Sequence, residues 1–191
     1  MHRSALTVVS MVFLPFFLAA GSAVAQSKAL GDPGTTGDPK HGEYLVNFGG
    51  CNDCHTPKVM TPKGPVPNPT KLLSGHQSDA KLPDLPAGLF APGKWGGITN
   101  PDMTAWVGPW GTSFAVNLTP DPATGIGGWT DAIFIKAMRT GKHLGEGRPI
   151  LPPMPWPGLA GLREQDLKDI FAYLHTVKPI VNKVPDPIPP R

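Results

Sequence analysis

The chain is 191 residues long and carries 17 Lys and Arg residues against 14 Asp and Glu, a formal net charge of +3. This balance does not favour nucleic-acid binding, because the lysines are scattered among prolines and acidic residues and form no basic run. The 25 prolines and 23 glycines exceed the usual share for this length, so much of the backbone is expected to be loop. A loop-rich chain buries little apolar surface to offset the conformational entropy that it loses on folding. This favours a cofactor that completes the core.

The N-terminus has the pattern of an export signal. Arg3 precedes an apolar run over residues 5–20, and Ala23-Val24-Ala25 supplies a small-residue cleavage site. The run is shorter than the roughly 20 apolar residues of a spanning helix, which favours a cleaved signal over a retained anchor. We therefore predict a signal peptide over residues 1–25, a periplasmic location and no stable membrane insertion after cleavage. Residues 26–37 are small, polar and rich in Gly and Pro, and are predicted to form a flexible leader.

A short helix is predicted from residue 38 to a Gly-Gly pair that ends it directly before the first cysteine. Asp38 can cap this helix, and Pro39 suits its first position. Gly42 costs roughly 1 kcal/mol relative to Ala inside a helix, so it is either a close-contact position or a tolerated glycine. The predicted apolar stripe of the helix consists of Tyr44, Leu45 and Phe48.

The next segment has the sequence Cys51-Asn52-Asp53-Cys54-His55. This spacing lets two thiols reach the two vinyl groups of one haem while the adjacent imidazole lies beneath the iron. A thioredoxin-like redox pair and half of a zinc site are the competing interpretations. The first lacks a preceding strand in a βαβ pattern, and the second lacks another Cys pair because these are the only cysteines. The motif therefore predicts one covalent haem c, attached through Cys51 and Cys54, with His55 as the proximal iron ligand.

Residues 56–111 show little helical periodicity. Five prolines between residues 57 and 69 exclude a long helix there. Trp95, Trp106 and Trp110 lie among Gly and Pro, where they could pack against a haem or simply anchor the loop. A connection this long is unusual inside a compact domain, and its apolar residues favour a functional or partner-facing role. We expect a long, irregular, Pro/Gly-rich insertion between the haem motif and the distal loop.

Two further helices are predicted in the C-terminal half. The first spans residues 131–140, with Thr130 as its cap, Gly141 at its end and Met138 on its core-facing side. The second runs from about residue 163 to 178, because apolar residues recur there at helical spacing. The following tail, residues 179–191, is too rich in proline to continue a helix. Residues 38–178 are accordingly predicted to form one domain.

The sixth iron ligand decides the function class, because His/Met ligation suits electron transfer whereas an open position permits ligand binding or catalysis. Met154 is favoured, since four prolines stiffen the loop around it just before the last helix. It could otherwise be apolar filler beside Trp156. His143 is more typical of a solvated helix end. The full set of candidates comprises Met60, Met103, Met138, Met154, His41, His76, His143 and His175.

The order of helix, Cys-x-x-Cys-His, distal-Met loop and terminal helix resembles class I c-type cytochromes. Within that family, residues 117–129 and Pro153-Met154-Pro155-Trp156 are similar to the cytochrome domains of membrane-bound alcohol and sugar-acid dehydrogenases. The resemblance implies an all-α fold whose first and last helices cross, with His55 and Met154 as axial ligands. It also implies that electrons pass from a dehydrogenase toward quinone or a terminal oxidase.

The leading hypothesis is therefore a periplasmic one-electron carrier that docks transiently with redox partner proteins, namely a dehydrogenase, an oxidase or a quinol-oxidising complex. A fixed electron-transfer subunit of a periplasmic dehydrogenase complex is the second hypothesis. The third is a haem enzyme or gas sensor with an open distal site. No catalytic residues are predicted, because the sequence has no carboxylate pair, phosphate loop or Ser/His/Asp-like cluster.

Overall fold

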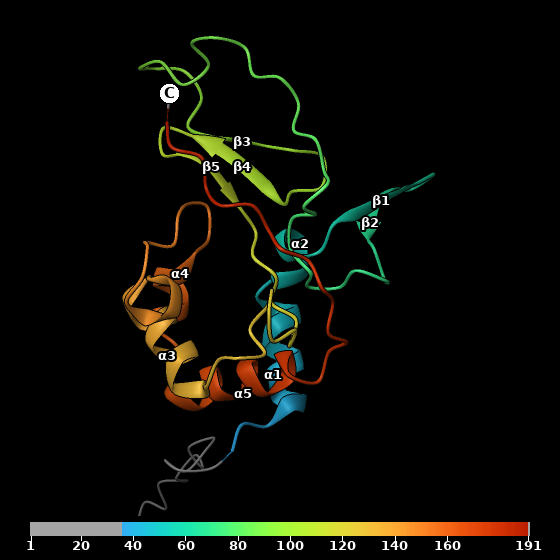
Figure 1. Ribbon diagram of the computed structural model, residues 1–191, viewed down its shortest axis with the longest axis vertical. Coiled ribbons are helices and arrows are strands. Elements are labelled where there is room, and N and C mark those ends of the chain that lie inside the picture. The colour runs from blue at the N-terminus through green and yellow to red at the C-terminus, as the bar shows by residue number, and fades with distance from the viewer. Residues whose placement is uncertain (1–35, 191) are drawn as a thin grey trace, which may run out of the picture.

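The computed structural model describes residues 36–190 (Figure 1). The predicted signal peptide and residues 26–35 of the predicted leader lie outside the described residues. The helices of the described part are α1 (Pro39–Phe48), α2 (Cys51–His55), α3 (Asp131–Thr140), η1 (His143–Gly145, a 3-10 turn), α4 (Trp156–Ala160) and α5 (Glu164–Leu174). The three longer helices confirm the predicted helical segments, with Asp38 and Thr130 as side-chain caps of α1 and α3. The last of them, α5, ends at Leu174, before the predicted end at about residue 178. No helix in residues 36–190 is long and apolar enough to cross a membrane.

The first and last helices pack against each other, and Gly42 lies at their contact. A Cβ atom at Gly42 would stand 1.9 Å from the carbonyl oxygen of Asp169 on α5, so the close-contact interpretation of this glycine is confirmed. Val46, one turn further along, is fully buried on the same side of α1. The predicted apolar stripe of α1 is wrong for Tyr44 and Phe48, which are 61% and 79% exposed. Because Gly42 and Val46 face α5, those two rings lie on the outer side of the helix.

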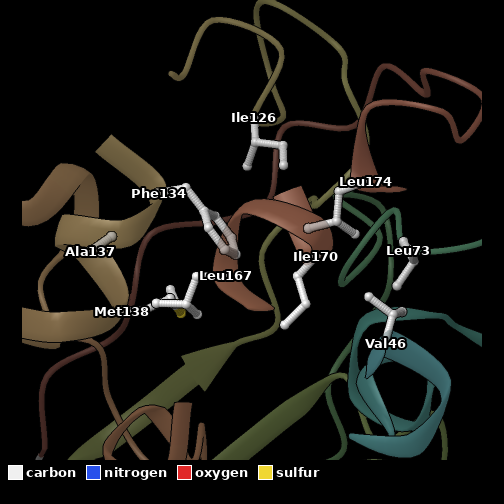
Figure 2. Close-up of a cluster of buried hydrophobic side chains, with 9 residues drawn as sticks. All are labelled: Val46, Leu73, Ile126, Phe134, Ala137, Met138, Leu167, Ile170 and Leu174. Atoms are coloured by element: carbon white, nitrogen blue, oxygen red, sulfur yellow. The ribbon is translucent and has the colours of Figure 1, made fainter. Parts of the chain in front are cut away.

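Helices α1, α3 and α5 enclose a hydrophobic core, together with residues from two loops (Figure 2). Phe134 and Phe171 contribute an aromatic contact between α3 and α5, with ring centroids 5.3 Å apart. Met138 is buried in this core, as its helical face predicted. The buried cluster consists of Val46, Leu73, Ile126, Phe134, Ala137, Met138, Leu167, Ile170 and Leu174.

The fold is not all-α, which corrects the sequence-based prediction. The insertion contains a hairpin of β1 (Lys58–Thr61) and β2 (Gly64–Pro67), and an antiparallel sheet of order β3-β4-β5 (Figure 1). Strand β3 is Ile98–Thr99, β4 is Ala105–Gly108 and β5 is Gly111–Phe114. The prolines exclude helix but are tolerated in β2, because each strand of a two-stranded hairpin is an edge strand. The insertion is therefore partly ordered into sheet rather than irregular throughout.

The described part of the C-terminal tail, residues 179–190, is not helical, as predicted, and it runs back across the molecule from α5 to the three-stranded sheet (Figure 1). Ile188 forms an isolated antiparallel bridge with Thr112 of β5, in which the distances from backbone nitrogen to carbonyl oxygen are 2.8 and 3.0 Å. Gly111 allows this approach, since a Cβ there would stand 2.1 Å from the carbonyl oxygen of Ile188. The tail thus packs against the insertion and joins two regions far apart in the sequence.

Candidate haem pocket

The two cysteines lie on the short helix α2. Their i, i+3 spacing places Cys51 and Cys54 on one side of a helix. Lys58 fixes the C-terminal end of α2, because its ammonium group donates to the carbonyl oxygens of Asn52, Asp53 and Thr56 at 3.1, 2.8 and 2.6 Å. Both cysteines are free and partly buried, and burial raises the pKa of both thiols. The motif is therefore held with two unpaired sulfurs on one helix.

The imidazole of His55 is buried, with 6% of the residue exposed. Its Nδ1 lies 2.8 Å from the carbonyl oxygen of Val116. A carbonyl only accepts hydrogen bonds, so Nδ1 carries the proton and the lone pair of the neutral ring is on Nε2. Burial also lowers the pKa of His55, which favours the neutral ring. A neutral imidazole whose orientation is fixed by a second hydrogen bond is the usual form of a histidine metal ligand.

The insertion supplies the surroundings of His55. The backbone N–H of Gly75 donates to the carbonyl oxygen of His55 at 2.8 Å, and the N–H of His76 donates to that of Ala115 at 2.9 Å. Gly75 has φ +76°, and a Cβ there would stand 2.5 Å from the Ala115 oxygen. Sequence reasoning missed the roles of Gly75 and Val116, because both lie in segments without periodicity and act through backbone atoms.

His55 lines an apolar cavity of about 950 Å³, including its open mouth. The apolar lining suits the faces of a porphyrin, and Cys54 stands in the wall beside His55. Cys51 does not line the cavity but packs against the hydrophobic core. The apolar part of the lining includes Trp106, Phe114, Val116, Leu118, Ile126, Trp129, Phe134, Met138, Ile150 and Met154.

The structure brings three of the sixth-ligand candidates to this cavity, namely Met154, Met138 and His143. Met60 and Met103 are 76% and 37% exposed and belong to the insertion. The other three histidines do not line the cavity: His41 contacts Asp169, His76 contacts Thr104, and His175 packs on Phe171. Of the three tryptophans singled out in the insertion, Trp106 lines the cavity, whereas Trp95 is 66% exposed and Trp110 donates to Ser113.

The loop that carries Met154 is attached at both ends. Ser113 of β5 donates its hydroxyl to the carbonyl oxygen of Pro152 at 2.5 Å. Trp156 packs on Gly141 at the end of α3, where a Cβ would stand 2.4 Å from the indole ring. Gly141 has φ +64° and forms the left-handed C-cap of α3. Its lack of a side chain also leaves space for the indole of Trp156. Met154 is thus held between the insertion and the α3 terminus.

No protein-family model matches the chain. Comparison with characterised proteins finds similarity to the cytochrome c subunit of a quinone-dependent alcohol dehydrogenase from Gluconobacter oxydans, with 42% identity over 81 residues, which is 41% of this chain and 17% of that protein. The cytochrome c subunit of gluconate 2-dehydrogenase from Pantoea cypripedii is 32% identical over 142 residues, 74% of this chain and 24% of that protein. A diheme cytochrome c-type protein from Cereibacter sphaeroides is 29% identical over 146 residues, 76% of this chain and 38% of that protein.

Cys54 and His55 of the Cys-x-x-Cys-His motif line an apolar cavity, and the chain is similar to proteins named as cytochrome c subunits, so the site resembles that of a cytochrome c domain. The resemblance predicted from the motifs is confirmed: the chain is similar to cytochrome c subunits of alcohol and gluconate dehydrogenases. The chain spans less than two fifths of the length of each of these three relatives.

Proposed function

We propose that this chain transfers single electrons through one covalently bound haem c. Cys51 and Cys54 form the thioether bonds, and His55 and Met154 are the axial ligands of the iron. The observation that carries the proposal is that His55 and Met154 both line one apolar cavity. Nδ1 of His55 is hydrogen-bonded to the carbonyl oxygen of Val116, which leaves Nε2 available to bind iron. The haem, when bound, supplies the redox centre, and ligation by His and Met gives a raised potential suited to electron transfer.

The proposal also covers the cellular location of the chain and its domain boundaries. Residues 1–25 are a cleaved signal peptide that directs the chain to the periplasm, and residues 26–37 are a leader. Residues 38–178 form a cytochrome c fold with a sheet-containing insertion, followed by the tail of residues 179–191. The periplasmic location is supported by the N-terminal sequence, in which a charged residue is followed by an apolar run and then by small residues typical of a cleavage site.

A spectroscopic experiment tests the ligand assignment. The holoprotein, matured in a host that attaches haem c, should retain its haem after denaturation and should show a methionine-to-iron charge-transfer band in the oxidised state. Met154→Ala should lose that band, whereas Met138→Leu, which alters the other methionine of the cavity, should keep it. High-spin haem that binds carbon monoxide readily in the wild type would contradict the assignment and favour an enzyme or gas sensor.

The relatives favour a second candidate, in which the chain is a fixed electron-transfer subunit of a dehydrogenase complex. Their names describe subunits of alcohol and gluconate dehydrogenases, and the insertion offers additional surface for such a contact. Co-purification with a catalytic chain at constant stoichiometry would establish the subunit role. A monomer in solution that exchanges electrons with several partners would establish the free carrier.

A further inference from the structure

The C-terminal tail is attached to the body of the molecule at two separate points. The first is Asn182, which is buried and whose backbone N–H donates to the hydroxyl of Thr124 at 3.0 Å. The second is the bridge between Ile188 and Thr112 of β5. Within residues 36–190, no hydrogen bond or ion pair reaches the intervening residues 183–187. This part of the tail is therefore held by hydrogen bonds only at its two ends.

One residue of this intervening segment, Pro187, lines the apolar cavity. It is half-buried, whereas its neighbours Asp186 and Ile188 are exposed. Because proline has a fixed φ and no N–H, Pro185 and Pro187 keep the segment extended and prevent it from pairing along its length with β5. The segment therefore covers part of the cavity through the ring of Pro187 without becoming a strand of the sheet.

Two consecutive residues of β5 hold the tail and the loop of Met154. The backbone of Thr112 exchanges two hydrogen bonds with Ile188, and the hydroxyl of Ser113 donates to the carbonyl of Pro152, two residues before Met154. Thr112 and Ser113 are each 7% exposed, so both attachments start from a buried strand. The tail is thus fastened beside the loop that carries the proposed distal ligand.

We propose that residues 183–188 form a strap over the cavity, which opens when the bridge between Ile188 and Thr112 breaks while Asn182 stays in place. The inference rests on the proposed function, because the closed strap limits the access of small ligands to a haem in this cavity. Two backbone hydrogen bonds can break without global unfolding, since a local opening disrupts only the bonds of the segment that moves. The buried Asn182 is the fixed end about which the strap moves.

Amide hydrogen exchange in the reduced holoprotein, followed by NMR, measures the opening. Ile188→Pro removes the N–H that donates to the Thr112 carbonyl at 3.0 Å, whereas Ile188→Ala keeps both backbone bonds and is the matched control. The Thr112 amide should exchange on the order of tenfold faster in Ile188→Pro than in Ile188→Ala. The Asn182 amide should exchange at the same rate in both variants, because its bond to Thr124 lies outside the strap.

Access to the cavity is measured separately, as the rate of carbon monoxide binding to the reduced holoprotein. Each variant is combined with Met154→Ala, so that dissociation of the proposed iron ligand does not limit this rate. Met154→Ala with Ile188→Pro should bind carbon monoxide on the order of tenfold faster than Met154→Ala with Ile188→Ala, because the strap is open for a larger fraction of the time.

Three outcomes would overturn the inference. Faster exchange of the Thr112 amide with equal rates of carbon monoxide binding would mean that the tail opens without covering the cavity. Equal Thr112 exchange in the two variants would mean that the bridge does not hold the strap, and an equal acceleration at Asn182 would mean that the whole tail detaches. Failure of the proposed function looks different: the wild type itself would carry no covalent haem, or would bind carbon monoxide as readily as Met154→Ala.

Discussion

The side-chain amide of Asn182 donates to the carbonyl oxygen of His76 at 2.8 Å, across 106 residues of sequence. The same amide nitrogen donates to Ser74 at 2.8 Å, and its oxygen accepts from Ser78 at 3.2 Å. Asn182 is 6% exposed, so these bonds are shielded from water. One side chain thus attaches the C-terminal tail to the segment that also holds His55 through Gly75.

We expect Asn182→Ala to destabilise the holoprotein by about 1–3 kcal/mol, because it leaves buried backbone groups without partners. Denaturant-induced unfolding, followed by circular dichroism and the haem spectrum, measures the change. The neighbouring Val181→Ala is the control: Val181 is 79% exposed and its truncation should alter the free energy of unfolding by less than about 0.5 kcal/mol. Equal stability of the two variants would show that the tail contributes little.

Gly42→Ala should destabilise the contact between α1 and α5. The added Cβ would stand 1.9 Å from the Asp169 carbonyl and 2.9 Å from Cβ of Tyr173, so the helices must move apart. Overpacking of this kind costs about 1–3 kcal/mol. Thermal and chemical unfolding of the holoprotein measure the loss.

Gly158→Ala in α4 is the matched control, since nothing lies within 4 Å of the position that a Cβ would occupy there. That change should be neutral or stabilising by up to about 1 kcal/mol, because alanine restricts the unfolded chain. A Gly42→Ala protein as stable as Gly158→Ala would contradict the described helix contact.

Ser113→Ala should loosen the distal loop, because it removes the hydroxyl that donates to the Pro152 carbonyl at 2.5 Å. A net loss of about 1 kcal/mol would raise the dissociation of Met154 from iron several-fold, if the proposed ligation is correct. Stopped-flow binding of imidazole to the oxidised protein reports this opening. Ser113→Thr retains the hydroxyl and should bind imidazole at nearly the wild-type rate. Wild-type kinetics in Ser113→Ala would exclude Ser113 as an anchor of the loop.

Asp166 makes the start of α5 sensitive to acid. Its carboxylate accepts from the Arg163 guanidinium at 2.8 and 2.7 Å and from the backbone N–H of Arg163 at 3.2 Å. The guanidinium hydrogen bonds hold the pKa of Asp166 below its usual value. Because the folded-state pKa is the lower one, this stabilisation is present above the unfolded-state pKa of about 3.9 and is lost as the pH falls through the folded-state value.

Asp166→Asn should therefore be less stable than wild type at neutral pH, and the difference in unfolding free energy should shrink below about pH 4. Glu164→Gln is the control: Glu164 is 63% exposed and pairs with Lys168 at 2.9 Å, an ion pair worth about 0–1 kcal/mol. Urea unfolding at a series of pH values measures both variants. A difference for Asp166→Asn that did not change with pH would count against the carboxylate as its cause.

Local signals along the chain were enough to predict the three longer helices α1, α3 and α5, but not the five-residue helix α4. Asp38-Pro39 and Thr130 at the helix starts, and apolar residues at helical spacing in α5, need no knowledge of distant partners. The stripe predicted for α1 failed because it relied on the same local information. The periodicity marked Tyr44 and Phe48 as apolar, but it could not show that Gly42, with no side chain, is the residue that meets α5.

The surroundings of His55, by contrast, depend on how distant segments come together in the folded protein. The Val116 carbonyl, the Gly75 amide and the tail residue Asn182 act through hydrogen bonds between segments separated by as many as 108 residues. Such bonds carry no periodic signature, because a backbone carbonyl is the same at every residue. The strands of the insertion were missed for a different reason: each spans only two to four residues, which is too short for a clear alternation of apolar and polar side chains, and β2 contains prolines.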